Sequence, residues 1–382
     1  MSALQTPHSP AAGQAGAEHT TREIAQQPAL WRELADILDL AQARIDAFLL
    51  PWLARPGTRV IFTGAGSSGF IAEMAADAAN AAWPAEARAI HTTSLLTHPQ
   101  LYLQRERPTL LVSFGRSGSS PESVAAVDLV RAQVDEVRFL DITCNAEGEL
   151  ARRGAGRADT LALLMPPASC DRSFAMTSSL TCMLLAALTV FEPAPWPQRL
   201  QRLQALSRLA EQLDTDWSKP VIELARQPYS RVIYLGSGPL EAAAREAALK
   251  LLELTAGRVT ALANTPLGFR HGPKSLLDGD TLVLVLRSAQ ALPRRYEQDL
   301  LDELRGDGVA ARVLSVGPAV AGQADDFALA VPDLPDPWLA PLWLGLAQRY
   351  ALQRSLAQGL SPDNPFPDGT VNRVVQGVTI HH

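Results

Sequence analysis

A loop rich in glycine and serine lies between residues 113 and 123, and its composition suits the binding of a phosphate group. The apolar residues 110–112 predict a buried strand that ends in Ser-Phe-Gly-Arg-Ser-Gly-Ser-Ser, and Pro121 suits the first turn of a following helix. Backbone N–H groups at such a helix start can approach an anion closely. Further donors are the guanidinium of Arg116 and the hydroxyls of Ser117, Ser119 and Ser120. The alternative is an ordinary strand-to-helix turn with a capping serine.

Two other stretches carry residues that could transfer protons. A helix predicted from about 240 to 254 places Glu246 and Lys250 four residues apart and Lys250 and Glu253 three apart, so all three lie on one face. Taken alone, this spacing favours a salt-bridge ladder on the surface. His271 lies in a loop with glycines on both sides, where an imidazole is free of helical constraint and could transfer protons. From the sequence alone, an exposed loop histidine without a catalytic role is an equally good interpretation.

The composition is that of a globular protein with two to three domains. Of its 382 residues, 47% are hydrophobic and 19% are charged, and the net charge of −6 offers nucleic acid no general attraction. We expect no membrane span, because no apolar run reaches about 18 residues, and no signal peptide. Three cysteines without ligand spacing fit a reducing compartment, so a cytoplasmic protein is expected. The histidines form no ligand-spaced cluster, and neither a metal nor a cofactor is expected.

Short apolar runs alternate with helical patterns from residue 59 onward, which predicts a parallel sheet with helices on both faces. A disordered arm is expected over 1–19, followed by a helical segment over 20–57. The mixed charges of that segment argue against a helix-turn-helix DNA reader. A first domain is predicted over 58–195, with strands at 60–62, 89–91, 110–112, 137–142 and 161–165 and a long helix at 173–191.

The second half of the chain repeats the first. Prolines at 193, 195 and 197 mark a break, and a helical linker over 196–218 leads to a second domain over 219–365, with a tail over 366–382. The predicted strands of the second domain lie at 232–235, 282–286, 312–315 and 327–331. Gly64 and Gly115 are 51 residues apart, and Gly236 and Ser288 are 52 apart. This agreement predicts an internal duplication.

The sequence resembles the sugar isomerase (SIS) domain proteins, which bind phosphosugars. The resemblance covers almost everything after residue 20 and is carried by residues 64–68, 113–123, 249–253 and 268–274. Residues 173–179, 361–365 and 371–379 narrow it to the D-galactosamine-6-phosphate deaminases, a group also described as tagatose-6-phosphate ketose/aldose isomerases. The expected fold class is therefore α/β, with two tandem SIS domains, each a doubly wound five-stranded parallel sheet flanked by helices.

This resemblance implies roles for individual residues. It assigns the phosphate to Ser67, Arg116, Ser117 and Ser120, with the guanidinium fork of Arg116 as the strongest donor unless Glu122 holds it. Family position implies that Glu253 is the base and that His271 opens the sugar ring from the neighbouring subunit, so a homodimer is expected. Sugar contacts are expected from Gly66, Ser68, Phe174, Thr177 and Gln376.

The expected partner is a phosphorylated amino sugar, and the expected reaction converts D-galactosamine-6-phosphate into D-tagatose-6-phosphate and ammonia. In related synthase domains a lysine of the C-terminal tail forms an imine with the sugar. Here Gln376 stands at that position, so covalent imine formation is not supported. Two alternatives remain open: an aldose–ketose isomerase that uses the same Glu253 and His271, and a non-catalytic phosphosugar sensor.

Overall fold

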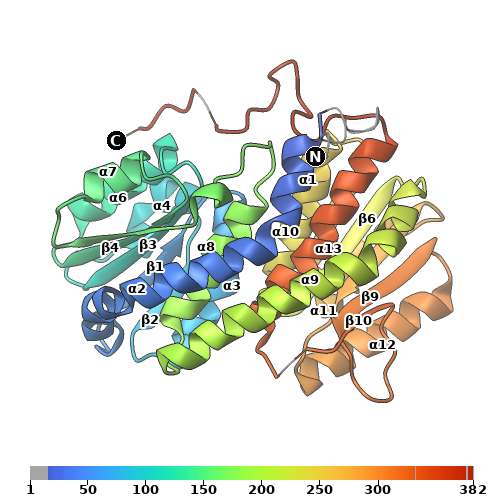
Figure 1. Cartoon of the computed structure of the whole chain (residues 1–382), viewed down its shortest axis with the longest axis horizontal. Helices are drawn as coiled ribbons and strands as arrows, with labels where there is room; N and C mark the ends of the chain where they lie inside the picture. The colour runs from blue at the N-terminus through green and yellow to red at the C-terminus, as the bar shows by residue number, and fades with distance from the viewer. Residues whose placement is uncertain (1–15, 332, 376, 382) are drawn as a thin grey trace, which may run out of the picture.

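The computed structural model describes residues 16–331, 333–375 and 377–381 and contains two five-stranded parallel sheets between helices (Figure 1). We call the first sheet with its helices module 1 and the second sheet with its helices module 2. The strand order is β2-β1-β3-β4-β5 in module 1 and β10-β9-β8-β6-β7 in module 2. Read from its opposite edge, the sheet of module 2 has the order β7-β6-β8-β9-β10, in which each strand takes the place of the corresponding strand of module 1. Two parallel five-stranded sheets of the same topology confirm the predicted fold class. The strands are β1 (Arg59–Thr63), β2 (Glu86–Ala89), β3 (Thr109–Gly115), β4 (Val137–Thr143), β5 (Thr160–Leu164), β6 (Arg231–Gly236), β7 (Thr260–Asn264), β8 (Thr281–Leu286), β9 (Arg312–Pro318) and β10 (Phe327–Leu329).

The helices divide into three groups. Module 1 holds α3 (Ser67–Ala82), α4 (Thr92–Thr97), α5 (Pro99–Tyr102), α6 (Pro121–Gln133), α7 (Glu149–Gly154) and α8 (Ser178–Phe191), with a 3-10 turn at Pro167–Ser169. Module 2 holds α10 (Pro239–Leu254), α11 (Pro266–Phe269), α12 (Ala291–Asp307) and α13 (Asp336–Ala357), with a 3-10 turn at Pro273–Leu276. The helices α1 (Glu18–Ala25), α2 (Gln27–Leu53) and α9 (Trp196–Arg226) lie outside the two repeats and pack along them (Figure 1).

One hydrophobic core joins the two modules. Alternate strand residues point to opposite faces of each sheet, and the inner faces of both sheets belong to a single buried cluster together with α2, α3, α8, α9, α10 and α13. Each outer face has a small core of its own, around Leu111 in module 1 and around Val283 in module 2. The α8 helix is buried at all its positions, as expected for a helix that is apolar on every side. The modules are therefore fixed to each other by packing.

The first loop of each module repeats the same backbone. Gly66 and Gly238 have φ of +57° and +56°, a region that L side chains rarely adopt. A Cβ on Gly64 would lie 2.5 Å from the backbone carbon of Ser68, and one on Gly236 would lie 2.2 Å from the carbonyl oxygen of Leu240. Both turns bring the following helix so close to the strand end that only glycine fits.

The structure departs from the predicted boundaries in several places. It adds β7, places β2 at 86–89 instead of 89–91, and starts α8 at Ser178 because Asp171 accepts the N–H groups of residues 177–179. The single helix α9 continues through the expected linker boundary at 218. Helix α1 begins inside the expected disordered arm, of which residues 1–15 lie outside the described part of the chain. Among the described residues, no helix is long and apolar enough to cross a membrane.

Candidate active site

The two modules meet where α10 packs against α3, and polar side chains from both meet there. Lys250 of α10 donates to Ser67 Oγ of α3 at 3.1 Å and to Glu253 Oε2 at 2.5 Å. Its Nζ also lies 3.3 Å from Glu246 Oε1. Ser67 is the first residue of α3, directly after the turn at Gly66. The predicted base of module 2 is therefore linked through one lysine to the first loop of module 1.

Burial distinguishes this cluster from the surface ladder that the spacing alone favours. The side chains of Lys250 and Glu246 are fully buried, whereas the side chain of Glu253 retains 23% exposure. Burial raises the pKa of Glu246 to about 7. Burial opposes the charge on Lys250, but the two nearby carboxylates outweigh it and raise the pKa of Lys250. A charged lysine thus fixes the carboxylate of Glu253, the most exposed member of the cluster.

Arg116 lies at the end of β3 and is only 7% exposed. Its Nη1 donates to Phe174 O at 3.2 Å and its Nη2 donates to Arg373 O at 2.9 Å. Burial lowers the pKa of Arg116 and the nearby charge of Arg373 lowers it further, whereas Asp171 and Glu253 act in the opposite direction. The predicted guanidinium and the predicted base are therefore close enough to influence each other. Glu122, the alternative partner, is not among the hydrogen-bond partners of Arg116 in the described chain.

The serines of this loop are partly occupied by local hydrogen bonds. Ser120 caps α6, because its Oγ accepts the N–H of Ser123 and donates to Ser123 Oγ at 2.7 Å. Ser117 Oγ accepts the N–H of Ser119, and Ser119 Oγ accepts the N–H of Glu149. The hydroxyl proton of Ser117 is not used in these contacts. Of the three predicted serine donors, Ser117 therefore has the most freedom to bind an anion.

The other predicted sugar contacts lie around the same region. Phe174 packs against Phe366 of the tail, with ring centroids 5.3 Å apart. Ser68 is buried at the start of α3, and Thr177 is fully buried with its hydroxyl hydrogen-bonded to Asp171. Gln376 lies outside the described residues. The contacts of these residues with a sugar stay predictions.

His271 lies in the loop between α11 and the 3-10 turn at Pro273–Leu276 and is exposed. Among the described residues, the hydrogen bond of this histidine is the one that its backbone N–H donates to Gly268 O. Its neighbours Arg270 and Lys274 form ion pairs with Glu303 of α12, which anchor the loop. The loop thus presents the imidazole on the surface of the chain.

In module 2, the loop after β8 corresponds to the serine-rich loop after β3, but its donors are hydrogen-bonded to carboxylates of the chain. The N–H of Ser288 donates to Glu297 Oε2 at 3.0 Å, and the Ser288 hydroxyl donates to Asp336 Oδ2 at 2.6 Å. The N–H of Ala289 donates to Asp336 Oδ1 at 2.8 Å. Carboxylates of the chain itself take the donors that would bind an anion. This arrangement favours one phosphate site per chain, in module 1.

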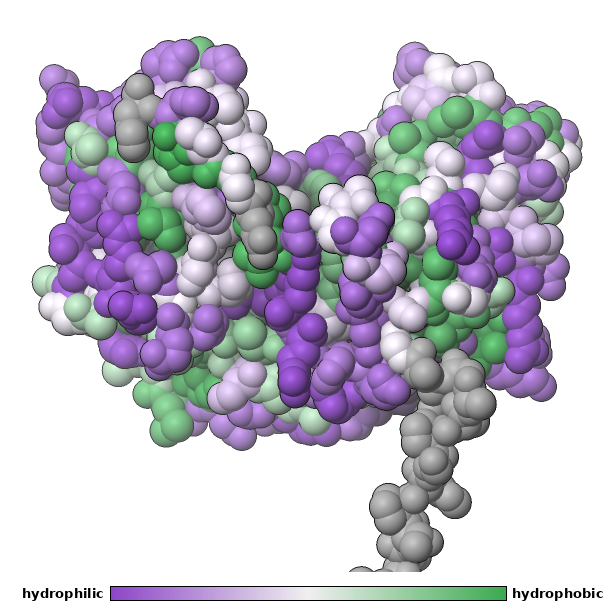
Figure 2. Space-filling model, turned by 90° about the horizontal axis from the view of Figure 1, so that it is seen from above, coloured by the Kyte–Doolittle hydropathy of each residue, from purple (hydrophilic) through white to green (hydrophobic). Residues whose placement is uncertain are grey.

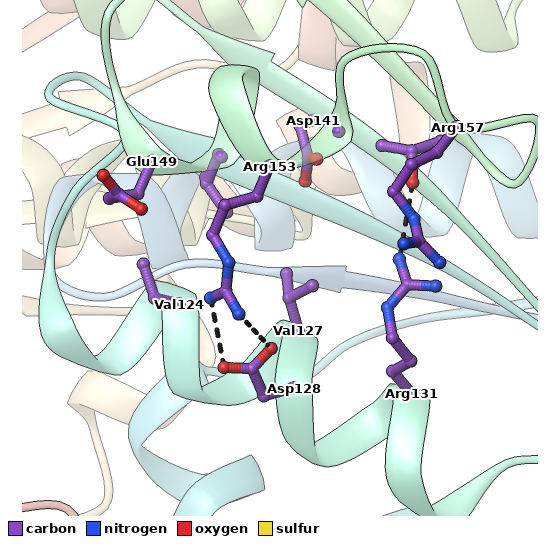
Figure 3. A pocket seen from close by; sticks show the side chains of 11 residues that line it. Val124, Val127, Asp128, Arg131, Asp141, Glu149, Arg153 and Arg157 are labelled. Atoms are coloured by element: carbon purple, nitrogen blue, oxygen red, sulfur yellow. Dashed lines mark hydrogen bonds and ion pairs between the residues drawn. The ribbon is translucent and has the colours of Figure 1, made fainter.

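A separate cavity of about 130 Å³ lies on the outer face of the first sheet, between α6, α7 and β4 (Figure 3). Asp141 points into it and is 2% exposed, and its Oδ1 has no hydrogen-bond partner among the described residues. Arg153 and Arg131 line the cavity in ion pairs with Asp128 and Asp159. None of the predicted site residues that the structure describes lines this cavity. The buried Asp141 in this cavity therefore bears on the stability of the fold and not on the candidate active site.

Replacing Asp141 by Asn should flatten the dependence of stability on pH. Burial raises the pKa of Asp141 from 3.8 to about 7, so between these values the folded chain binds a proton that the unfolded chain lacks. The free energy of unfolding therefore falls as pH rises through this window. From about pH 5 to about pH 8, the stability of D141N relative to the wild type should grow by about 2 kcal/mol. Urea denaturation at the two pH values measures this, with the exposed Asp135→Asn as control. A constant difference would contradict it.

Comparison with known proteins finds close relatives over nearly the whole chain. The chain is 42% identical over 371 residues to a D-galactosamine-6-phosphate deaminase AgaS from Shewanella sp. (strain ANA-3), a match that covers 96% of this chain and 93% of that protein. It is 44% identical over 384 residues to D-galactosamine-6-phosphate deaminase AgaS from Escherichia coli, with 98% of each covered. No family model matches the sequence.

Solved structures agree with these matches. The tagatose-6-phosphate ketose/aldose isomerase from Escherichia coli superposes with a TM-score of 0.87 at 39% identity, covering 98% of this chain and 99% of that one. A candidate tagatose-6-phosphate ketose/aldose isomerase from Clostridium novyi NT superposes with a TM-score of 0.92 at 37% identity, covering 97% and 96%. Glucosamine-6-phosphate deaminase from Thermotoga maritima shares the fold, with a TM-score of 0.72 at 23% identity over 94% of this chain and 99% of that one.

Proposed function

The chain belongs to the AgaS family of D-galactosamine-6-phosphate deaminases, with two tandem SIS domains, and we propose that it converts D-galactosamine-6-phosphate and water into D-tagatose-6-phosphate and ammonia. The observation that carries the proposal is the contact of Lys250, which holds Glu253 in module 2, with Ser67 of module 1. The charge of Glu253 also acts on the pKa of the buried Arg116 of module 1. Cations and hydroxyl donors suit the phosphate, and a partly exposed carboxylate suits a base.

In the proposed mechanism, Glu253 moves one proton along the open-chain sugar. It removes the proton from carbon 2, which carries the amino group, and returns it to carbon 1, while the carbon-1 oxygen gains a proton and the nitrogen loses one. The product is a ketimine, because the nitrogen is already present in the substrate. Water then hydrolyses the carbon–nitrogen bond and releases ammonia and the ketose phosphate. Lys250 supports this step by fixing the Glu253 carboxylate at 2.5 Å.

Ring opening is assigned to His271, and we propose that it acts across a homodimer interface. The exposed position of His271 on an anchored loop supports this assignment. An imidazole can donate and accept protons near neutral pH, as opening of a cyclic sugar requires. We also propose a cytoplasmic location, supported by three free cysteines. For the two domains we propose the limits 58–195 and 219–365.

A second candidate is an aldose–ketose isomerase without deamination. The names of the solved relatives favour it, since two are described as tagatose-6-phosphate ketose/aldose isomerases. The same carboxylate and histidine would serve, and the difference lies in whether carbon 2 carries an amine or a hydroxyl.

The test is to supply the purified protein separately with D-galactosamine-6-phosphate, D-glucosamine-6-phosphate and D-tagatose-6-phosphate. Ammonia and sugar products are measured independently. We expect ammonia and D-tagatose-6-phosphate in equal amounts from the first substrate. Conversion of D-tagatose-6-phosphate to an aldose without ammonia release from either amino sugar would support the isomerase instead. Binding of all three without turnover would contradict both and favour a sensor.

A further inference from the structure

The guanidinium of Arg116 is oriented by backbone oxygens from two other parts of the chain. One hydrogen bond goes to the carbonyl of Phe174 at 3.2 Å and the other to the carbonyl of Arg373 at 2.9 Å. Among the described residues, no carboxylate forms an ion pair with Arg116. The direction of this buried cation therefore depends on the segment 171–174 and on the C-terminal tail, both of which must be held in place by further contacts.

Two buried carboxylates hold the segment 171–174. Glu23 of α1 is 2% exposed and accepts the N–H of Arg172 at 2.6 Å and the N–H of Ser173 at 3.1 Å. Asp171 is fully buried and turns to the start of α8, where it accepts the N–H of Ser179 at 2.9 Å. Asp171 thus anchors the segment to module 1, whereas Glu23 anchors it to a helix about 150 residues earlier in the chain.

The C-terminal tail closes the arrangement from the other side. The tail leaves α13 in module 2 and runs back over module 1 (Figure 1). Seen from above, the molecule has two lobes with a hollow between them (Figure 2). Arg373 donates from Nε to Ser173 O at 3.0 Å and from Nη2 to Asp171 O. Nearer its start, the tail places Asp363 at the N-terminus of α1, where it accepts the N–H of Thr20 at 2.7 Å. The tail and Glu23 thus hold the same segment, and Asp363 ties the tail to the helix that carries Glu23.

We propose that Glu23 is a positioning residue for phosphate binding and acts through Arg116. Glu23, the segment 171–174 and Arg373 form a clasp, which joins α1 and the tail and fixes the two carbonyls that direct the guanidinium toward the substrate phosphate. This inference rests on the proposed function only in taking Arg116 as the phosphate ligand. Its probe is inorganic phosphate, whose binding does not depend on which sugar reaction follows.

The test is the Glu23→Gln variant of the full chain. An amide keeps the shape of the side chain but turns an NH₂ group toward the backbone N–H groups of residues 172 and 173, so the segment loses a hydrogen bond. We expect the Kd for inorganic phosphate, measured by calorimetry, and the KM for D-galactosamine-6-phosphate to rise about tenfold. The turnover number should change by less than about threefold, because Glu253 is untouched. Glu18→Gln, an exposed change on the same helix, should leave all three values unchanged.

Arg373→Ala tests the clasp from the exposed tail, where folding of the modules is not at stake. It should weaken phosphate binding in the same direction, and Arg373→Lys, which keeps one donor, should recover part of the loss. Folded Glu23→Gln and Arg373→Ala variants with wild-type phosphate affinity would overturn the inference. So would a wild-type protein that does not bind phosphate. A protein that binds phosphate but releases no ammonia would contradict the proposed function and leave the clasp intact.

Discussion

A Glu253→Gln variant should lose about 100- to 10,000-fold in turnover number with D-galactosamine-6-phosphate, whereas its KM should stay within a few-fold of wild type. The amide keeps the size of the side chain and can still accept a hydrogen bond from Lys250, so the cluster around Ser67 should persist. It cannot take the proton from carbon 2. The loss should therefore appear in the chemical step and not in phosphate binding.

Steady-state kinetics with ammonia detection measures this effect, and calorimetry with inorganic phosphate shows whether the binding site is intact. Glu241→Gln is the matched control, since Glu241 lies on the same helix and is ion-paired with Arg245 away from the cluster. It should retain nearly full turnover. A folded Glu253→Gln variant with full turnover would show that another group moves the proton.

The sheets were predictable from the sequence to the extent that their strands are continuous apolar runs. Strands such as β3 and β8 are buried at every position, as expected for a parallel sheet covered on both faces. The matching separations of Gly64 from Gly115 and of Gly236 from Ser288 also predicted the duplication. The structure shows that the turns at Gly66 and Gly238 repeat the same backbone. Strand β7 was missed because it is an edge strand of the sequence Thr-Ala-Leu-Ala-Asn that is only half-buried and has no strong apolar pattern.

The elements that carry the candidate site could be predicted where its residues follow one another along the chain. The loop around Arg116 and the helix that carries Glu253 both could be located by local spacing. The burial of that helix could not be predicted from local spacing. Lys250 and Glu246 have the spacing of a surface ladder, and only the packing of α10 against α3 and α13 removes them from water. The contacts of Glu23 and Arg373 with segment 171–174 were equally hidden, since they join residues about 150 and 200 positions apart.

A His271→Asn variant should lose about 100-fold or more in turnover number, because ring opening would lack its proton carrier. The larger consequence appears when this variant is combined with Glu253→Gln in mixed dimers. If each site takes Glu253 from one subunit and His271 from the other, a heterodimer of the two inactive variants contains one site with both residues intact. Random reassociation of equal amounts should then restore about one quarter of wild-type activity.

The same mixture distinguishes this arrangement from a site built within one chain. If Glu253 and His271 of the same subunit worked together, every site in every mixed dimer would carry one inactive residue, and activity would stay at the level of the separate variants. The exposed position of His271 makes the first outcome the expected one, since the ion pairs of Arg270 and Lys274 with Glu303 of α12 anchor its loop at the surface of the chain. Unfolding and refolding the two variants together, with each variant refolded alone as control, measures the difference. Recovery of activity only in the mixture would establish that the two subunits share the site. If heterodimers were shown to form and no activity returned, the histidine and the carboxylate would belong to a site within one chain.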